Sequence, residues 1–431
     1  METRWLDKRP IAPLAVLRIA FGAVLFISTL RFIWKGWVDE FYVKPIVHFP
    51  FYGFEWLHPL PATGMHLVFG LMLAAALFMT LGLFYKTATA LFLLCFTYVE
   101  LLDKTYYLNH YYFVSVFTFL LLLVPANRAL SLDVRRKPSL GTTHVPAWTI
   151  LILQAQLLLV YFFAGLSKLT PDWLIHAMPL RIWLPANTTM PLIGPLLDKV
   201  WVAYAFSWFG AIFDLTIGIF LLNRKTRPIA YGFVVIFHVL TACLFKIGMF
   251  PWIMITATLI FWDFANDHAS TSAGTWAPKK QKLLTLTLML YFTVQLLLPF
   301  RYLLYPGRLF WTEQGYRFSW RVMLMEKAGT AFFYVKDPKT GRKGEIDNSH
   351  FLTPFQERQM STQPDMILQF AHYLETTYRQ KGFPYPQITV ESYVTLNGSG
   401  SRLYIDSTID LGHQPDNLLP KTWILPFQQS K

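Results

Sequence analysis

Residues 161–173, YFFAGLSKLTPDW, close a long apolar run that begins near Ala147. The run is close to the ~20 residues that a helix needs to cross a bilayer. Lys168 lies at its end, just before Pro171, which stops the helix. Ionisable residues in membrane helices usually serve a function, and an apolar wall disfavours a charged amine, so Lys168 is a candidate neutral base. The alternative is a lysine that snorkels to the lipid headgroups.

The composition is that of an integral membrane protein. Of 431 residues, 54% are hydrophobic and 15% are charged, whereas soluble proteins carry about 25% charged residues. The net charge of +13 fits basic inner loops, and no stripe of basic and aromatic residues predicts nucleic-acid binding. Cys95 and Cys243 both lie in apolar segments, which argues against a disulfide framework, and no metal-ligand spacing occurs.

Hydropathy predicts a polytopic α-helical membrane domain over residues 1–304. We expect about nine spans, or eight if 87–102 or 249–264 is re-entrant. The spans are placed at 11–34, 64–83, 87–102, 108–125, 147–168, 201–222, 227–245, 249–264 and 283–304.

Loop charges predict the orientation. With nine spans, the basic loops all fall on one side, which the positive-inside bias makes cytoplasmic together with the N-terminus. The outer side then receives the 103–110 loop, the turn after Lys168 and the C-terminal region. The basic residues are Arg4, Lys8, Arg9, Lys86, Arg128, Arg135, Arg136, Lys137, Arg224, Lys225, Arg227, Lys279, Lys280 and Lys282.

From about Tyr305 onward, charges and turns return, so residues 305–431 predict a soluble α+β or β-rich domain on the outer face. Segments 330–337 and 343–352 read as a β-hairpin, and 363–381 as an amphipathic helix ended by Gly382. Segments 387–396 and 402–411 flank NGSG and predict a second hairpin.

Several polar residues are candidates for chemistry. Asn109 and His110 lie where the fourth span begins, and a histidine there can relay a proton or donate a hydrogen bond. His238 and Asp214 lie within spans, and an acid there needs a basic partner, either Lys168 or His238. For each of them the alternative is a structural hydrogen bond between helices.

The segment 311–320, WTEQGYRFSW, joins the last span to the soluble domain. Trp311, Tyr316 and Trp320 are candidates for an aromatic wall over an outward-facing substrate pocket, and the alternative is interfacial anchoring.

With these residues in view, the chain resembles the vitamin K-dependent γ-glutamyl carboxylase family, whose membrane part is the horizontally transferred transmembrane (HTTM) domain. The resemblance covers about residues 10–426. The motifs that carry it are LDKTYYLNHYY, YFFAGLSKLTPDW, FH followed by LFKIGMF, WTEQGYRFSW, DMILQFA and TWILPF.

The resemblance implies a membrane enzyme that uses reduced vitamin K, O2 and CO2 to carboxylate glutamate in a protein or peptide, with quinone epoxide as the second product. It makes Lys168 the base that deprotonates the hydroquinone, and His110 a second catalytic residue. It places Asn109, His238 and Asp214 in cofactor binding, without a metal.

Some features depart from the family pattern. Ser167 stands where the family often has a second lysine, and the lumenal disulfide of long members is absent. The chain resembles a short microbial form, which implies a bacterial inner membrane and a periplasmic soluble domain. Two alternatives stay open, namely a quinol epoxidase that does not carboxylate peptides and a non-enzymatic quinone- or lipid-binding module.

Overall fold

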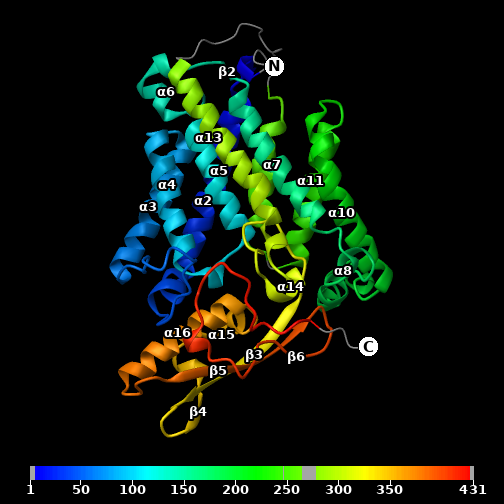
Figure 1. Ribbon diagram of the computed structural model, residues 1–431. Helices are drawn as coiled ribbons and strands as arrows, with labels where there is room; N and C mark the ends of the chain where they lie inside the picture. Colours follow the sequence, from blue (N-terminus) through cyan, green and yellow to red (C-terminus); the bar gives the residue numbers. More distant parts are fainter. Residues whose placement is uncertain (1–4, 246, 265–277, 428–431) are drawn as a thin grey trace.

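The computed structural model describes residues 5–245, 247–264 and 278–427. A bundle of long helices forms one part of the molecule, and a small domain with a β-sheet lies at one end of the bundle (Figure 1). The N-terminal segment and α6 (Leu132–Arg136) lie at the opposite end of the bundle.

Seven helices in the described part of the chain are long and apolar enough to cross a membrane. They are α2 (Ala12–Trp34), α3 (Ala62–Leu81), α4 (Tyr85–Leu102), α7 (Trp148–Leu166), α10 (Val200–Leu222), α11 (Arg227–Leu244) and the segment Gln281–Leu304, formed by α13 (Pro278–Leu297) and η7 (Leu298–Leu304). Two further apolar helices are shorter, α5 (Asn109–Leu123) and α12 with η6 (Phe250–Phe261). Each segment expected to span therefore corresponds to a helix, but only seven have the full length.

A buried arginine ties helix ends together at the end of the bundle away from the sheet. Arg18 of α2 is fully buried. Its guanidinium donates hydrogen bonds to the carbonyls of Ala126 at 3.1 Å, Thr80 at 2.7 Å and Leu130 at 2.5 Å. The last carbonyls of a helix have no partner within the helix, so Arg18 satisfies acceptors that lipid could not.

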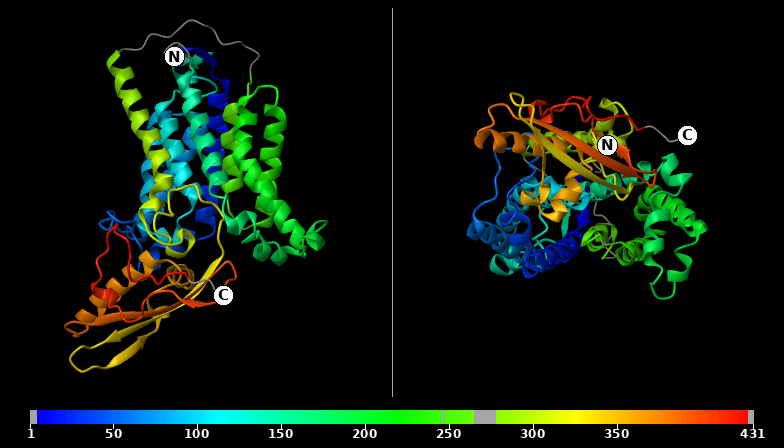
Figure 2. Two further views of the ribbon diagram at one scale, coloured as in Figure 1. Left: turned by 45° about the vertical axis from the view of Figure 1, so that its right-hand side comes forward. Right: turned by 90° about the horizontal axis from the view of Figure 1, so that it is seen from below.

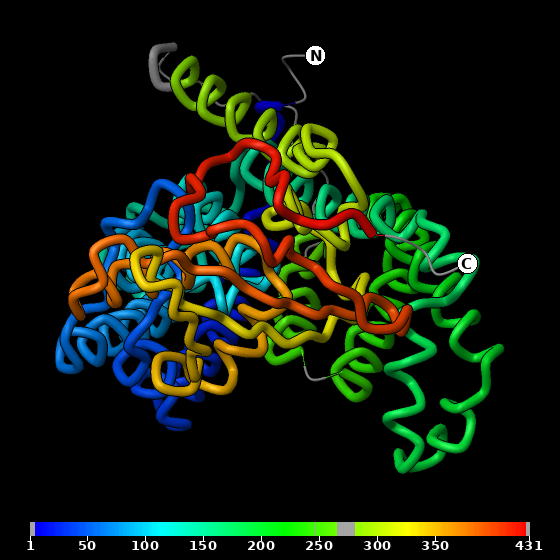
Figure 3. The backbone as a smooth tube through the Cα atoms, turned by 60° about the horizontal axis from the view of Figure 1, so that its bottom comes forward, coloured from blue at the N-terminus to red at the C-terminus, as the bar shows by residue number. Residues whose placement is uncertain are grey.

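The soluble domain is built on a four-stranded antiparallel sheet with the order β4-β3-β5-β6. The strands are β3 (Lys327–Lys336), β4 (Lys343–Ile346), β5 (Gln387–Leu396) and β6 (Arg402–Leu403). Helices α15 (Pro354–Met360) and α16 (Pro364–Gln380) complete the domain. Seen from below, the sheet lies across the end of the bundle (Figure 2), and the tube view shows the same arrangement (Figure 3).

The alternation of side chains decides which face of the sheet is covered. Phe333 and Val390 are fully buried, and the ring of Phe333 meets that of Phe370 of α16 edge-on at 4.9 Å. Phe332 and Tyr393, which point to the other face, are exposed. One face is therefore the core, as the sequence pattern predicts.

The second strand of each predicted hairpin is shorter than expected. β6 ends at Leu403 instead of 411, because Asp406 accepts a hydrogen bond from the amide of Thr408 and begins a turn. β4 ends at Ile346 instead of 352, because Asp347 caps a short 3-10 helix by accepting from the amide of Ser349. Local polar side chains thus replace the ladder hydrogen bonds in both segments.

Ion pairs dock the soluble domain on the bundle. Asp365 of α16 contacts Lys104 Nζ at 2.8 Å and Arg317 Nη1 at 2.6 Å. Gln356 of α15 donates to the carbonyl of Val47 at 2.7 Å. Burial by itself raises the pKa of Asp365, but the attraction of Arg317 and Lys104 outweighs it and holds this pKa well below its usual value.

The ion pairs of Asp365 predict that the stability of the protein depends on pH. A carboxyl whose pKa is depressed in the folded state contributes stability above its unfolded pKa of about 4, and that stability is lost as the pH falls below this value. Asp365→Asn leaves two cations without their carboxylate. The side chain is 34% exposed, so solvent screening limits the expected loss at pH 7 to about 2 kcal/mol.

Apparent melting of the purified protein at pH 7 and pH 3 measures the effect. Wild type is expected to lose more stability than Asp365→Asn between these pH values. The exposed Asp198→Asn serves as the control and is expected to behave as wild type. Equal loss of stability in wild type and Asp365→Asn would contradict the role given to the Asp365 ion pairs.

Candidate active site

The C-terminal end of α7 brings Lys168 against Asp214 of α10. Lys168 Nζ donates hydrogen bonds to Asp214 Oδ2 at 2.7 Å and to the carbonyl of Ala164 at 3.2 Å. Both residues are buried, with 6% and 5% of their surface exposed. The amine is therefore held in a buried ion pair instead of reaching the headgroups, and the partner of Asp214 is Lys168.

A glycine allows this pairing. Gly165 lies one turn before Lys168, and a Cβ added to it would approach the backbone nitrogen of Leu215 to 2.8 Å. Leu215 is the neighbour of Asp214 in the sequence. Small residues let membrane helices approach closely. Gly165 thus sets the distance between α7 and α10 at the level of the ion pair.

Lys168 and Asp214 line an apolar cavity, which we call the Lys168 cavity. Its volume is about 90 Å³. His238 of α11 lies on its wall, with Nε2 at 3.1 Å from the hydroxyl of Tyr161, while its Nδ1 is buried without a hydrogen-bond partner. Its other lining residues include Val160, Ala164, Trp173, Phe206, Phe237 and Met254. The cavity therefore offers an amine, a carboxylate and an unused imidazole nitrogen within apolar walls.

Asn109 and His110 line a second cavity, which we call the Arg321 cavity, of about 460 Å³. Asn109 Nδ2 donates to the carbonyl of Arg321 at 2.7 Å, and its Oδ1 accepts from the hydroxyl of Tyr107 at 3.0 Å. The same Tyr107 oxygen accepts from the amide of Phe318 at 2.7 Å. The loop before α5 and the segment after η7 are thereby fixed to each other around this cavity.

The two cavities meet at a common wall. Ile247, Phe250, Val322 and Met323 line both of them. The ring of Phe250 lies 5.6 Å from that of His110 and 5.8 Å from that of His238. The wall thus consists of apolar side chains, with one histidine on either side of Phe250.

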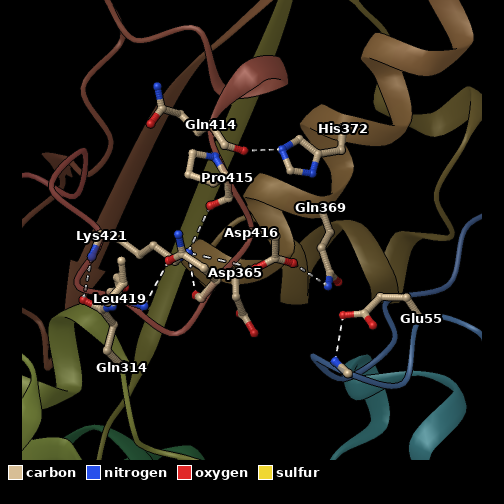
Figure 4. A network of polar contacts seen from close by, with 12 residues as sticks. Glu55, Gln314, Asp365, Gln369, His372, Gln414, Pro415, Asp416, Leu419 and Lys421 are labelled. Carbon is tan, nitrogen blue, oxygen red and sulfur yellow. Dashed lines mark hydrogen bonds and ion pairs between the residues drawn. The ribbon is translucent and has the colours of Figure 1, made fainter.

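A third cavity of about 300 Å³ lies between the domains and is lined by Asp365, Lys104 and Arg317. Polar contacts of the soluble domain lie along its wall (Figure 4). Gln369 Nε2 donates to Asp416 Oδ2 at 3.2 Å, and Lys421 Nζ donates to the carbonyl of Asn417 at 2.8 Å. Its charges are largely paired within the chain, which fits a docking region.

The three aromatic candidates have different surroundings. Tyr316 lines the Arg321 cavity, and its hydroxyl donates to the carbonyl of Arg321 at 3.2 Å. Burial raises the pKa of Tyr316, so it remains a neutral donor. Trp311 is buried against Tyr404, and Trp320 stacks on Tyr112 at 4.8 Å. Neither tryptophan is among the described residues that line the three cavities.

Sequence reasoning missed two arginines of the Arg321 cavity, Arg31 and Arg321. Arg31 is a charged residue inside the predicted span 11–34, which is itself a functional signal. Arg321 directly follows the segment 311–320 that was singled out for its aromatic residues. Within the described residues, no cluster of His, Cys, Asp or Glu could hold a metal ion.

Comparison with known families gives two matches. The HTTM domain matches residues 7–265. The lumenal domain of vitamin K-dependent gamma-carboxylase matches residues 280–430. No solved structure matches the chain.

The role of Gly165 is testable. Gly165→Ala is expected to destabilise the protein by about 1–3 kcal/mol, because the added methyl forces α7 and α10 apart. Gly232→Ala in α11 is the matched control, since nothing lies within 4 Å of the place that its added methyl would occupy. Apparent melting of the purified variants compares them. Equal stability of the two variants would show that the approach at Gly165 is not required.

Proposed function

The chain belongs to the vitamin K-dependent gamma-carboxylase family, and from this membership we propose that it carboxylates glutamate side chains of a protein or peptide, coupled to epoxidation of reduced vitamin K. The observation that carries the proposal is the Lys168–Asp214 pair in an apolar cavity that adjoins the cavity of Asn109 and His110. Two adjoining cavities can hold a quinone and an acceptor side chain next to each other.

The Lys168 cavity fits a reduced quinone. Its walls are apolar, which suits a lipid-soluble ring, and its few polar atoms suit the ring hydroxyls. Nδ1 of His238 has no hydrogen-bond partner and could bind a hydroxyl, and the amine of Lys168, paired with Asp214, lines the same cavity. When bound, the reduced quinone with O2 supplies the strong base that removes a γ-proton from glutamate, and it leaves as the epoxide.

Lys168 accepts the hydroxyl proton of the quinol in this proposal. A lysine acts as a base only when its amine is neutral. Nζ lies 2.7 Å from Asp214 Oδ2, so the amine can pass a proton to the carboxylate. The amine is then neutral, and no isolated charge is left in the apolar wall. The buried position also keeps water from the reactive base.

The Arg321 cavity receives the acceptor side chain. Asn109, His110 and Tyr316 place polar groups there, and the common wall with the Lys168 cavity brings the acceptor next to the quinone. The soluble domain contributes to this cavity through Phe355 and Gln359 of α15. A peptide acceptor would therefore enter from the side of the soluble domain.

Orientation follows from the family and from loop charge. The C-terminal match is to a lumenal domain, which supports an extracytoplasmic soluble domain. Basic α6 lies at the opposite end of the bundle. We propose a cytoplasmic N-terminus, a bacterial inner membrane and a periplasmic soluble domain.

Lys168→Arg tests the base. Arginine retains the positive charge opposite Asp214 but cannot be deprotonated in a protein, so epoxide formation and CO2 fixation are expected to fall by at least about 10²-fold. The purified protein is incubated with reduced vitamin K, O2, labelled CO2 and a short glutamate peptide. Epoxide and peptide label are both measured.

Lys199→Ala is the control, because this lysine is exposed. Full epoxide formation by Lys168→Arg would show that another group is the base. Epoxide without peptide label in wild type would indicate a quinol epoxidase, and the absence of both products would indicate a quinone- or lipid-binding module.

A further inference from the structure

The Arg321 cavity contains positive charge without a balancing acid. Arg31 from α2 and Arg321 from the segment after η7 both line it, and no aspartate or glutamate does so among the residues that the structure describes. A buried cation without a partner is costly. Arg321 is buried and Arg31 is half-buried, and a cavity that keeps both of them without an acid is suited to an anionic ligand.

Arg31 stands in the last turn of α2, at the end of the bundle near the soluble domain. Its guanidinium lies 5.1 Å from the ring of Trp37, a cation–π contact that leaves its edge N–H groups available. Within the described residues, Arg31 forms no ion pair. Its position is thus supported by an aromatic ring instead of a carboxylate.

Arg321 has a similar environment. It is 9% exposed, its guanidinium lies 4.4 Å from the ring of Tyr302, and its Nε is buried without a hydrogen-bond partner. Its backbone carbonyl accepts hydrogen bonds from Asn109 and from Tyr316. The backbone is therefore fixed at two points, while the charged group keeps unused donor capacity.

Three acids near this region are committed elsewhere. Asp365 pairs with Lys104 and Arg317, and Glu313 pairs with Lys327 at 2.8 Å. Glu100 accepts a hydrogen bond from Ser115 and does not line the cavity. The positive charge of Arg31 and Arg321 is therefore left for a ligand.

The proposed reaction needs two positive charges at this place. Removing the γ-proton of a glutamate whose γ-carboxyl is ionised breaks a C–H bond, transfers the proton to the base formed from the reduced quinone and O2, and leaves its electron pair on carbon. The result is an ene-diolate with two negative charges, which other enzymes stabilise with cations. The electron pair then forms the C–C bond to CO2, and the product again carries two negative charges as a malonate side chain.

We propose that Arg31 and Arg321 bind the γ-carboxylate of the acceptor and stabilise the second negative charge that appears on deprotonation and remains in the dicarboxylate product. The inference rests on the proposed function. Arginine suits this task because its planar donors match carboxylate oxygens and it stays charged. The site therefore takes acidic side chains and binds a dicarboxylate more tightly than a monocarboxylate.

Binding in the absence of quinone tests the site independently of catalysis. Three peptides of one sequence carry glutamate, γ-carboxyglutamate or glutamine at one position, and their affinities for the full-length protein are measured. Wild type is expected to bind the γ-carboxyglutamate peptide roughly tenfold more tightly than the glutamate peptide. It is expected to bind the glutamine peptide most weakly. Arg31→Gln and Arg321→Gln are each expected to remove most of this preference.

Turnover adds a second readout. Release of tritium from the γ-carbon of the glutamate peptide is expected to fall about 10²-fold in Arg321→Gln. Arg31→Lys and Arg321→Lys keep the charge and are expected to restore part of both signals. This result would distinguish the effect of a lost charge from the effect of a misfolded variant. Arg358→Gln is the matched control, because Arg358 lies on the neighbouring α15 and does not line the cavity.

The outcomes separate this inference from the proposed function. Equal affinity of wild type for the three peptides, or an unchanged preference in both glutamine variants, would overturn the inference. A wild type that shows the preference but releases no tritium and forms no epoxide would support the carboxylate site and refute the carboxylase proposal. An equal loss of affinity for all three peptides in the variants would mean a merely structural role.

Discussion

The ion pair between Lys168 and Asp214 is the interaction on which the arrangement of the site depends. Two charges within the helical bundle are tolerated only when each satisfies the other, and the contact requires α7 and α10 to approach closely, which Gly165 permits. The same requirement fixes the amine at the end of α7, with its stem against Gly210 and its Nζ beside the ring of Trp173. The pair of side chains that fixes the approach of α7 and α10 therefore also contains the candidate base.

The second cavity depends on contacts between segments far apart in the sequence. Asn109, the first residue of α5, donates to the carbonyl of Arg321, and Tyr107 of the loop before α5 accepts from the Phe318 amide. These bonds make the positions of two loops depend on each other. The soluble domain is held against the same loop by Asp365 and Lys104. The loop that docks this domain is therefore the same loop that helps to build the cavity.

The sequence predicted what depends on local pattern and missed what depends on the packing of distant segments. The helices from 11 to 304 follow from apolar runs. α16 follows from its three- and four-residue spacing, and it ends at Gln380, shortly before Gly382 with φ +97°. The shortened β6 did not follow, because Asp406 diverts the backbone into a turn. Lys168, Asp214 and His238 were each recognisable as polar residues in apolar runs. Which of them touch was not, since contact between α7, α10 and α11 is set by helix rotation.

The distribution of charge around the two cavities has a common logic. The cation of the Lys168 cavity is paired with a carboxylate, so it can release or take a proton without leaving an isolated charge in the apolar wall. The cations of the Arg321 cavity are supported by the rings of Trp37 and Tyr302, which hold a guanidinium without neutralising it. One arrangement suits a group that exchanges a proton, and the other suits groups that must stay charged. The apolar wall at Phe250 keeps these two environments apart.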